Sequence, residues 1–249
     1  MGTPEFAVAS LAILVENNYN IVGVITAPDR KAGRGQKIRF SDVKEYAMSQ
    51  NLNILQPTNL KDDTFINELK SLNANLQIVV AFRMLPEIVW SMPSKGTINL
   101  HASLLPNYRG AAPINWAIIN GEKESGVSTF FIEKEIDTGK IIDRKSTPIN
   151  ENENVGELYE RLMTMGADLM FETVNKIQNE NIDGQIQVVT PELKSAPKIF
   201  KQDCEINWNQ NAQIVHNFIR GLSPYPASWC SLYHRENNSS KTFKFFQSE

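Results

Sequence analysis

The chain has 249 residues, with 25 Lys or Arg against 28 Asp or Glu, so its net charge near neutral pH is −3. That length can bury a sizeable core in one large domain or two ordinary ones. Two cysteines, Cys204 and Cys230, are too few for a disulfide scaffold or a zinc ribbon. The longest apolar run, residues 6–15, is shorter than the roughly 20 residues of a membrane-spanning helix. We therefore expect a cytoplasmic globular protein without a membrane segment, and the charge argues against general coating of nucleic acid.

Strand-like and helix-like segments alternate through the first two thirds of the chain. Strands are expected at residues 19–26, 76–82 and 97–101. Helices are expected between them at residues 6–16, 41–50 and 64–72, with Ser41 and Thr64 as N-caps. Later segments predict two strands joined by a turn, and then a long helix, at residues 127–132, 141–145 and 155–177. This alternation predicts an α/β fold with a mostly parallel sheet and helices on both faces.

The organisation changes after about residue 180. Residues 1–180 form one predicted domain, and the polar, proline-containing residues 181–202 indicate a linker. Residues 203–249 are predicted to begin a second, mainly β domain. Its expected elements are a helix and two strands, at residues 212–221, 231–233 and 242–246.

Positive charge is concentrated in residues 28–44. Six basic and two acidic side chains give this stretch a net charge of +4, which leaves −7 for the rest of the chain. Arg34 lies between two glycines, and such a backbone presents a guanidinium in a way that suits phosphate better than core packing. A solvated loop without a ligand is the alternative interpretation.

Residues 96–121 contain the polar side chains best suited to chemistry. Asn99 and His101 are two positions apart on a predicted strand, so both project from the same face. They lie at the carboxyl end of that strand, where open parallel sheets bind their ligands. An amide donor beside an imidazole suits a reaction that develops negative charge on oxygen. The imidazole also needs a carboxylate, and Asp137, between two strands, is a better candidate than Asp143, inside one.

Other cofactor motifs are weak or lacking in the sequence. Gly33-Arg34-Gly35 lacks the third glycine of a dinucleotide fingerprint. The sequence contains no Walker lysine, no HExxH motif, and no cluster of His, Cys and carboxylate at ligand spacing. We expect neither metal nor thiol chemistry.

The motifs resemble those of the folate-dependent formyltransferases, in the form that acts on methionyl-tRNA. The most specific match is residues 99–114, NLHASLLPNYRGAAPI. Shorter matching runs are spread over essentially the whole chain, at residues 1–7, 28–35, 135–139, 196–199, 206–208 and 219–221.

The resemblance implies a Rossmann-like catalytic domain followed by the start of an OB-like β-barrel. It also implies transfer of the formyl group of 10-formyltetrahydrofolate to the α-amine of methionyl-initiator tRNA, by a monomeric, bacterial-type enzyme of translation initiation. Asn99 and protonated His101 would stabilise the negative formyl oxygen, and Asp137 would hold His101 in place and favour its charged form. The amine proton would leave through Asp137, His101 or a water molecule.

The resemblance further implies where the substrates bind. Tetrahydrofolate is expected against a turn formed by Ser103, Leu104, Leu105 and Pro106. The pterin slot would be lined by Phe82, Arg83, Met84, Leu85, Thr138 and Gly139. The acceptor end of the tRNA is expected at a basic loop with Arg34, Lys37 and Arg39.

Two departures from the family pattern give further expectations. Family members begin with an apolar strand before the segment that starts at Met1, so we expect the catalytic domain to lack its first strand. The family's β-barrel is longer than residues 203–249, so the second domain is expected to be truncated. Two alternative functions share these motifs in part: an amino-sugar nucleotide formyltransferase, and a catalytically inactive module that binds folate or RNA.

Overall fold

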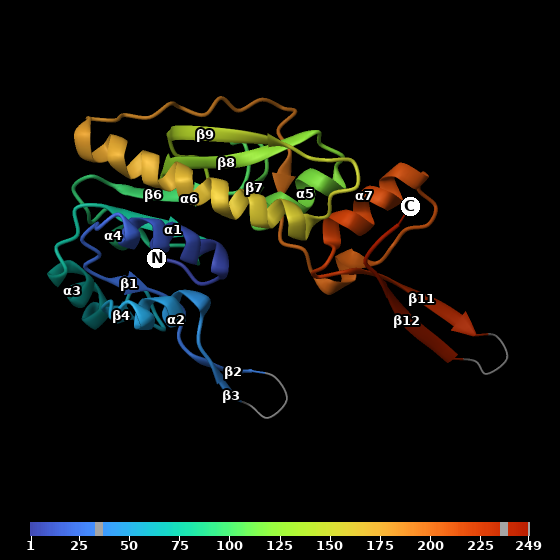
Figure 1. Cartoon of the computed structure of the whole chain (residues 1–249), viewed down its shortest axis with the longest axis horizontal. Helices are drawn as coiled ribbons and strands as arrows, with labels where there is room; N and C mark the ends of the chain where they lie inside the picture. The colour runs from blue at the N-terminus through green and yellow to red at the C-terminus, as the bar shows by residue number, and fades with distance from the viewer. Residues whose placement is uncertain (33–36, 235–238, 249) are drawn as a thin grey trace. The chain divides into compact units, whose positions relative to one another are not determined.

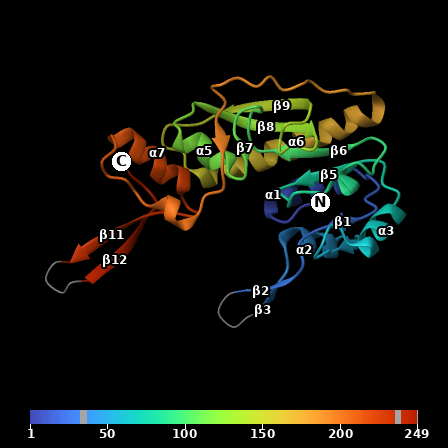
Figure 2. The same cartoon turned by 180° about the vertical axis from the view of Figure 1, so that it is seen from behind.

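The computed structural model describes residues 1–32, 37–234 and 239–248 (Figures 1 and 2). The chain divides into two compact units. The first comprises Met1–His101, Ser128–Arg144 and Met163–Gln187. The second comprises Ala102–Val127, Lys145–Leu162 and Val188–Glu249.

The first unit contains most of a four-stranded sheet. Its strands, in spatial order, are β5 (Gln77–Val80), β6 (Thr97–His101), β8 (Glu124–Phe131) and β9 (Ile141–Pro148). β5 runs parallel to β6, with Val79 opposite Asn99, and β6 runs antiparallel to β8, with His101 opposite Ser128. A separate parallel pair is formed by β1 (Val24–Ile25) and β4 (Ile54–Leu55). The predicted α/β fold is confirmed.

Helices pack against these strands. The first unit contains α1 (Glu5–Glu16), α2 (Asp42–Ser49), α3 (Asp63–Ser71), α4 (Glu87–Trp90) and much of α6 (Val155–Asn179). α6 lies along the sheet (Figure 1), where Thr173 and Thr129 share a buried hydrogen bond of 2.8 Å between their hydroxyls. A core between α3, α4 and the strands consists of Ile25, Leu55, Leu60, Phe65, Leu69, Val79, Leu85 and Val89.

The two predicted N-caps have different outcomes. Ser41 caps α2, because its hydroxyl accepts a hydrogen bond of 3.1 Å from the Lys44 N–H. Thr64 is not a cap, and that prediction is wrong. The carboxylate of Asp62 caps α3 instead, accepting from the N–H groups of Thr64 and Phe65 at 3.0 and 3.2 Å.

The predicted strand at residues 19–26 is reduced to Val24–Ile25, because these residues have a ladder partner in β4. On the side away from β4, the first two residues of the chain lie between β1 and β5. The Gly2 N–H donates to Ile25 O at 3.1 Å, the Val80 N–H donates to Met1 O at 2.9 Å, and the Met1 amine donates to Ile78 O at 2.6 Å. Met1 and Gly2 therefore pair with both strands.

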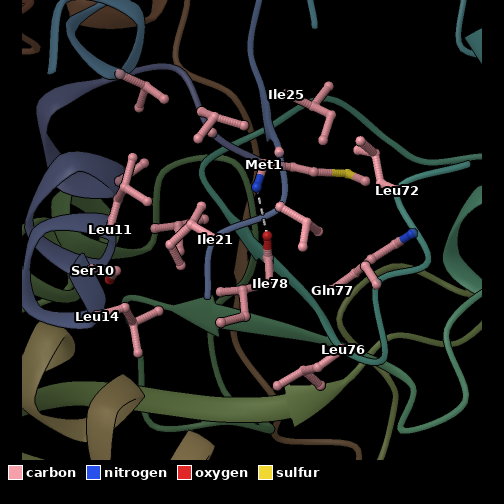
Figure 3. Close-up of a pocket in the computed structure, with 18 of the residues that line it drawn as sticks. Met1, Ser10, Leu11, Leu14, Ile21, Ile25, Leu72, Leu76, Gln77 and Ile78 are labelled. Carbon is pink, nitrogen blue, oxygen red and sulfur yellow. Dashed lines mark hydrogen bonds between the residues drawn. The ribbon is translucent and has the colours of Figure 1, made fainter. Parts of the chain in front are cut away.

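A groove continues between the two strands beyond Met1 (Figure 3). It is lined mainly by apolar side chains, among them Leu11, Leu14, Ile21, Leu72 and Leu76. Ser10 also lines it, and within the described residues the Ser10 hydroxyl has no hydrogen-bond partner. Burial at the end of this groove lowers the pKa of the Met1 amine to about 5.

The second unit contains shorter strands and two packed helices. Its elements are β7 (Arg109–Gly110), α5 (Pro113–Ile119), β10 (Ser195–Ala196), the 3₁₀ helix η1 (Lys201–Cys204), α7 (Ala212–Leu222), β11 (Ser228–His234) and β12 (Ser239–Phe245). β7 and β10 are parallel, and Gly110 is required there: its φ is +125°, and a Cβ would lie 2.4 Å from Ala196 O. The two strands expected at residues 231–233 and 242–246 are present as the longer β11 and β12, which pair antiparallel.

Candidate functional site

His101 and Asp137 come together at the carboxyl end of β6. His101 is the last residue of β6, and Asp137 lies in the loop between β8 and β9. Their side chains are only 8% and 11% exposed, and Nδ1 of His101 lies 3.8 Å from Oδ2 of Asp137. This separation exceeds hydrogen-bond length but brings the carboxylate within direct electrostatic range of the imidazole.

Asn99 precedes His101 by two positions on the same face of β6. Its ladder neighbours are Val79 on β5 and Phe130 on β8. The side-chain oxygen of Asn99 is buried and has no hydrogen-bond partner within the described part of the chain. Since buried polar atoms are nearly always hydrogen-bonded, this amide is suited to contact a bound ligand.

The loop that carries Asp137 has a defined main-chain path. Asp137 has a left-handed φ of +55°. The Thr138 hydroxyl donates to Glu135 O at 3.1 Å, and the Phe131 N–H donates to Lys140 O at 2.9 Å. A Cβ at position 139 would lie 1.7 Å from Phe131 O, so only glycine fits there. The sequence prediction of a turn around Asp137 is confirmed.

Residues 82–85 follow β5, whose carboxyl end lies at the same edge of the sheet as His101 because β5 and β6 are parallel. Leu85 belongs to the core, whereas Met84 is 69% exposed. The Arg83 guanidinium donates to the carbonyls of Thr58 and Pro57 and lies 5.7 Å from the Phe82 ring centroid. Arg83 is thus held by main chain, and the exposed Met84 offers an apolar contact.

The turn at residues 103–106 belongs to the second unit. The buried Ser103 hydroxyl donates to Asn107 O at 2.7 Å, and the Asn107 N–H donates to Leu104 O at 3.2 Å. Leu105 is fully buried, and the peptide bond between Leu105 and Pro106 is cis. The turn is closed by its own hydrogen bonds.

The basic stretch forms a hairpin that we call the basic arm, β2 (Arg30–Ala32) with β3 (Lys37–Arg39). In both views the arm extends away from the other elements of the first unit (Figures 1 and 2). Arg39 is exposed. Arg34 lies outside the described residues.

The root of the basic arm is fixed by Asp29. Its carboxylate accepts from Lys44 Nζ at 2.6 Å and from Gln56 Nε2 at 2.8 Å. The Gln56 amide, and then the Lys44 ammonium, lower the pKa of Asp29. This network was not predicted; the high density of charge in residues 28–44 marks Asp29 and Lys44, but nothing in the sequence marks Gln56.

Sequence reasoning also missed two contacts made by the polar segment after α6. Lys194 Nζ donates to Glu122 Oε1 at 2.6 Å, and Tyr108 donates to the same oxygen. Burial raises the pKa of Tyr108. Gln187 contacts the Asp137 loop through its side chain. No periodic or motif signal marks these residues, because their partners are distant in sequence.

Two kinds of feature are absent from the described residues. No described helix is long and apolar enough to cross a membrane. Among the same residues, no group of three or more His, Cys, Asp or Glu side chains could hold a metal ion.

Relatives of known name cover the whole chain. The chain is 56% identical over 249 residues to a methionyl-tRNA formyltransferase of Flavobacterium johnsoniae, covering 100% of this chain and 78% of the relative. It is 55% identical over 252 residues to a methionyl-tRNA formyltransferase of Bacteroides thetaiotaomicron, with the same coverage.

Solved structures share the fold. An N-formyltransferase of Helicobacter canadensis, crystallised with folinic acid and dTDP-3-aminofucose, is similar with a TM-score of 0.65 and 25% identity, over 88% of this chain and 78% of that one. HypX of Aquifex aeolicus, solved with tetrahydrofolic acid, has a TM-score of 0.60 at 17% identity, over 74% of this chain and 32% of that one, which shows a shared fold.

Family models match both parts of the chain. The formyl transferase model matches residues 1–174, and the model of the formyl transferase C-terminal domain matches residues 198–249. The chain therefore belongs to the formyl transferase family.

Proposed function

We propose that this protein transfers the formyl group of 10-formyltetrahydrofolate to the α-amine of methionyl-initiator tRNA. The observation that carries the proposal is the Asn99, His101 and Asp137 arrangement at the end of β6, in a chain 56% identical over its full length to a methionyl-tRNA formyltransferase. The N-formyltransferase of Helicobacter canadensis, crystallised with an amino sugar, is only 25% identical. The higher identity to the methionyl-tRNA formyltransferase favours tRNA over an amino sugar as the acceptor.

Three side chains of the first unit carry the chemistry. The methionine amine attacks the formyl carbon of 10-formyltetrahydrofolate to give a tetrahedral intermediate. The bond from that carbon to the folate nitrogen then breaks, and the amine proton passes to the leaving nitrogen through Asp137, His101 or a water molecule. Asn99 donates a hydrogen bond from Nδ2 to the formyl oxygen as that oxygen becomes negative. Its buried Oδ1 is an acceptor without a partner among the described residues, so it can accept a hydrogen bond from a bound substrate. Protonated His101 donates from Nε2, because Nδ1 faces Asp137 at 3.8 Å. Asp137 holds that imidazole in place from the Nδ1 side.

Folate contacts are proposed for each unit separately. In the second unit the proposed contact is the turn at residues 103–106, whose main chain is fixed by Ser103 and Asn107. In the first unit, residues 82–85 and Thr138 with Gly139 line the pterin slot. The exposed Met84 and the restricted path at Gly139 support this assignment, since a flat ring needs an apolar contact and a fixed wall.

The tRNA is assigned to the basic arm. The stretch from 28 to 44 carries a net charge of +4, and phosphate contacts supply most of the affinity of proteins for nucleic acid. The proposed contacts are Arg34, Lys37 and Arg39. The hydrogen bonds of Asp29 with Lys44 and Gln56 would hold the base of the arm in place when tRNA is bound.

A formyl-transfer assay with two acceptors tests the proposal. Charged initiator tRNA and a dTDP-linked amino sugar are supplied separately with 10-formyltetrahydrofolate, and His101→Ala serves as the inactive control. We expect transfer to the tRNA alone, and only by the unaltered chain. Transfer to the sugar would establish the amino-sugar alternative, and no transfer with retained folate binding would establish an inactive binding module.

A further inference from the structure

Gln187 lies in an extended segment that pairs with the first residue of β9. Gln185 and Ile141 exchange two backbone hydrogen bonds of 2.7 and 2.8 Å in an antiparallel bridge. In this register, position 187 lies opposite Gly139. All of these residues belong to the first unit, so the segment brings Gln187 to the loop of Asp137.

The Gln187 amide binds this loop on both sides of Thr138. Nε2 donates to Asp137 O at 3.0 Å and to Gly139 O at 2.8 Å, so both hydrogens of one amide nitrogen are used. The side chain is nearly buried, at 8% exposure. Such a pair of donated hydrogen bonds fixes two carbonyls relative to each other and to the segment beyond α6.

The main chain at Asp137 needs support of this kind. Its φ of +55° is uncommon for a residue other than glycine and persists where surrounding contacts determine it. Bonds from Thr138 to Glu135 and from Phe131 to Lys140 hold the loop before and after this point. Gln187 acts between them, on the carbonyl of Asp137 itself.

We propose that Gln187 is a positioning residue, which keeps the carboxylate of Asp137 at its place beside His101. The inference rests on the proposed catalytic role of Asp137. Displacement of a catalytic group by about 1 Å can lower turnover by up to about 100-fold, so loss of two hydrogen bonds to the loop lowers kcat. One of these bonds holds Gly139, which is assigned to the pterin slot, so kcat is compared at saturating folate. The tRNA is assigned to the basic arm, away from these bonds, so KM for charged tRNA is preserved.

The test compares Gln187→Met, which keeps the length of the side chain but removes its donors, with Gln185→Met. Gln185 is exposed and its described hydrogen bonds are from the main chain, so this control places the same side chain two positions away. We expect Gln187→Met to lower kcat about 10-fold with KM for charged tRNA within twofold. Gln185→Met should leave both unchanged.

A double-mutant cycle separates positioning from general stability. Gln187→Met should lower the melting temperature by the same amount in the unaltered chain and in an Asp137→Ala background. In the Asp137→Ala background it should cause no further loss of kcat, since the carboxylate that Gln187 positions is gone. Gln187→Asn, which keeps the amide on a shorter chain, gives a second variant with the same expectation should Gln187→Met fold poorly.

The outcomes distinguish the two proposals. If Asp137→Ala retains full turnover, the catalytic assignment fails. If Asp137→Ala loses turnover while both Gln187 variants keep a normal kcat, or lose it equally in the two backgrounds, Gln187 is a structural residue and the positioning role is refuted.

Discussion

Asp29 and Asp137 are both carboxylates beside a basic side chain, but they are held in different ways. Asp29 receives short hydrogen bonds from Lys44 and Gln56, at 2.6 and 2.8 Å, at the root of the basic arm. Asp137 lies 3.8 Å from His101 on a loop that glycine and glutamine contacts fix through the main chain. The first arrangement joins two segments, whereas the second fixes the backbone and keeps the carboxylate beside His101.

Breaking the catalytic pair is expected to have the largest effect. His101→Ala and Asp137→Ala should each lower kcat by about 100-fold or more, because such groups act mainly in the transition state. Binding of a folate analogue should change little, which an equilibrium titration can measure. Asp143→Asn is the control, since Asp143 pairs with Lys176 on α6 and takes no part in the proposed chemistry. Near-normal turnover in either alanine variant would refute the pair's role.

The basic arm is expected to act on affinity rather than on chemistry. Arg34→Ala should weaken binding of charged tRNA by about 10-fold at low salt and reduce the log–log salt slope by about 0.7, the value for one phosphate contact on a single strand. Measurements at several salt concentrations test this. Arg144→Ala removes the same charge from β9 and should leave the slope unchanged. Equal slopes for all three proteins would exclude tRNA binding at Arg34.

The groove beside Met1 predicts an effect on stability alone. Burial lowers the pKa of the amine from 8.0 to about 5, so the unfolded chain gains a proton below pH 8 that the folded chain does not bind. Stability contributed by the neutral amine is therefore lost as pH falls from about 8 to 5. Five apolar, β-branched residues added ahead of Met1 would remove this amine and could pair with both β1 and β5.

We expect that extension to raise the melting temperature by about 5 °C and to reduce its fall between pH 8 and pH 5. A proline-containing extension of equal length is the control, because proline cannot donate to a ladder. Calorimetry at the two pH values measures both. If the two extensions give equal melting temperatures, the groove does not accept a strand.

The sequence predicted features set by local rules. Period-two spacing placed Asn99 and His101 on one face of β6, and the Ser41 cap followed from residue preference. Thr64 was predicted as the N-cap of α3, but the cap lies two residues earlier at Asp62, and aspartate is the stronger capping residue.

Features that depend on distant partners were not predicted. Gln187 is 50 positions from Asp137, and no pattern within either segment indicates their contact. The strand at residues 19–26 is short because pairing with β4, rather than β propensity, decides its length. The division of the chain into a domain at residues 1–180, a linker at residues 181–202 and a second domain at residues 203–249 remains a prediction.

The smallest expected effect concerns the Asp29 network. The pKa of Asp29 is lowered in the folded chain. The contribution of its carboxylate to stability is therefore fully present above pH 3.8, the ordinary aspartate pKa, and is lost as the pH falls through the lower pKa of the folded state. Asp29→Asn should lower the melting temperature by about 1–2 °C at pH 7, because partly exposed ion pairs contribute little, and the difference should disappear near pH 2. Thermal unfolding at both pH values, beside Asp183→Asn on the exposed Lys140 pair, measures this. A difference that persists unchanged at pH 2 would show that Asp29 acts through packing, and the contrast with Asp137 would then rest on the loop contacts alone.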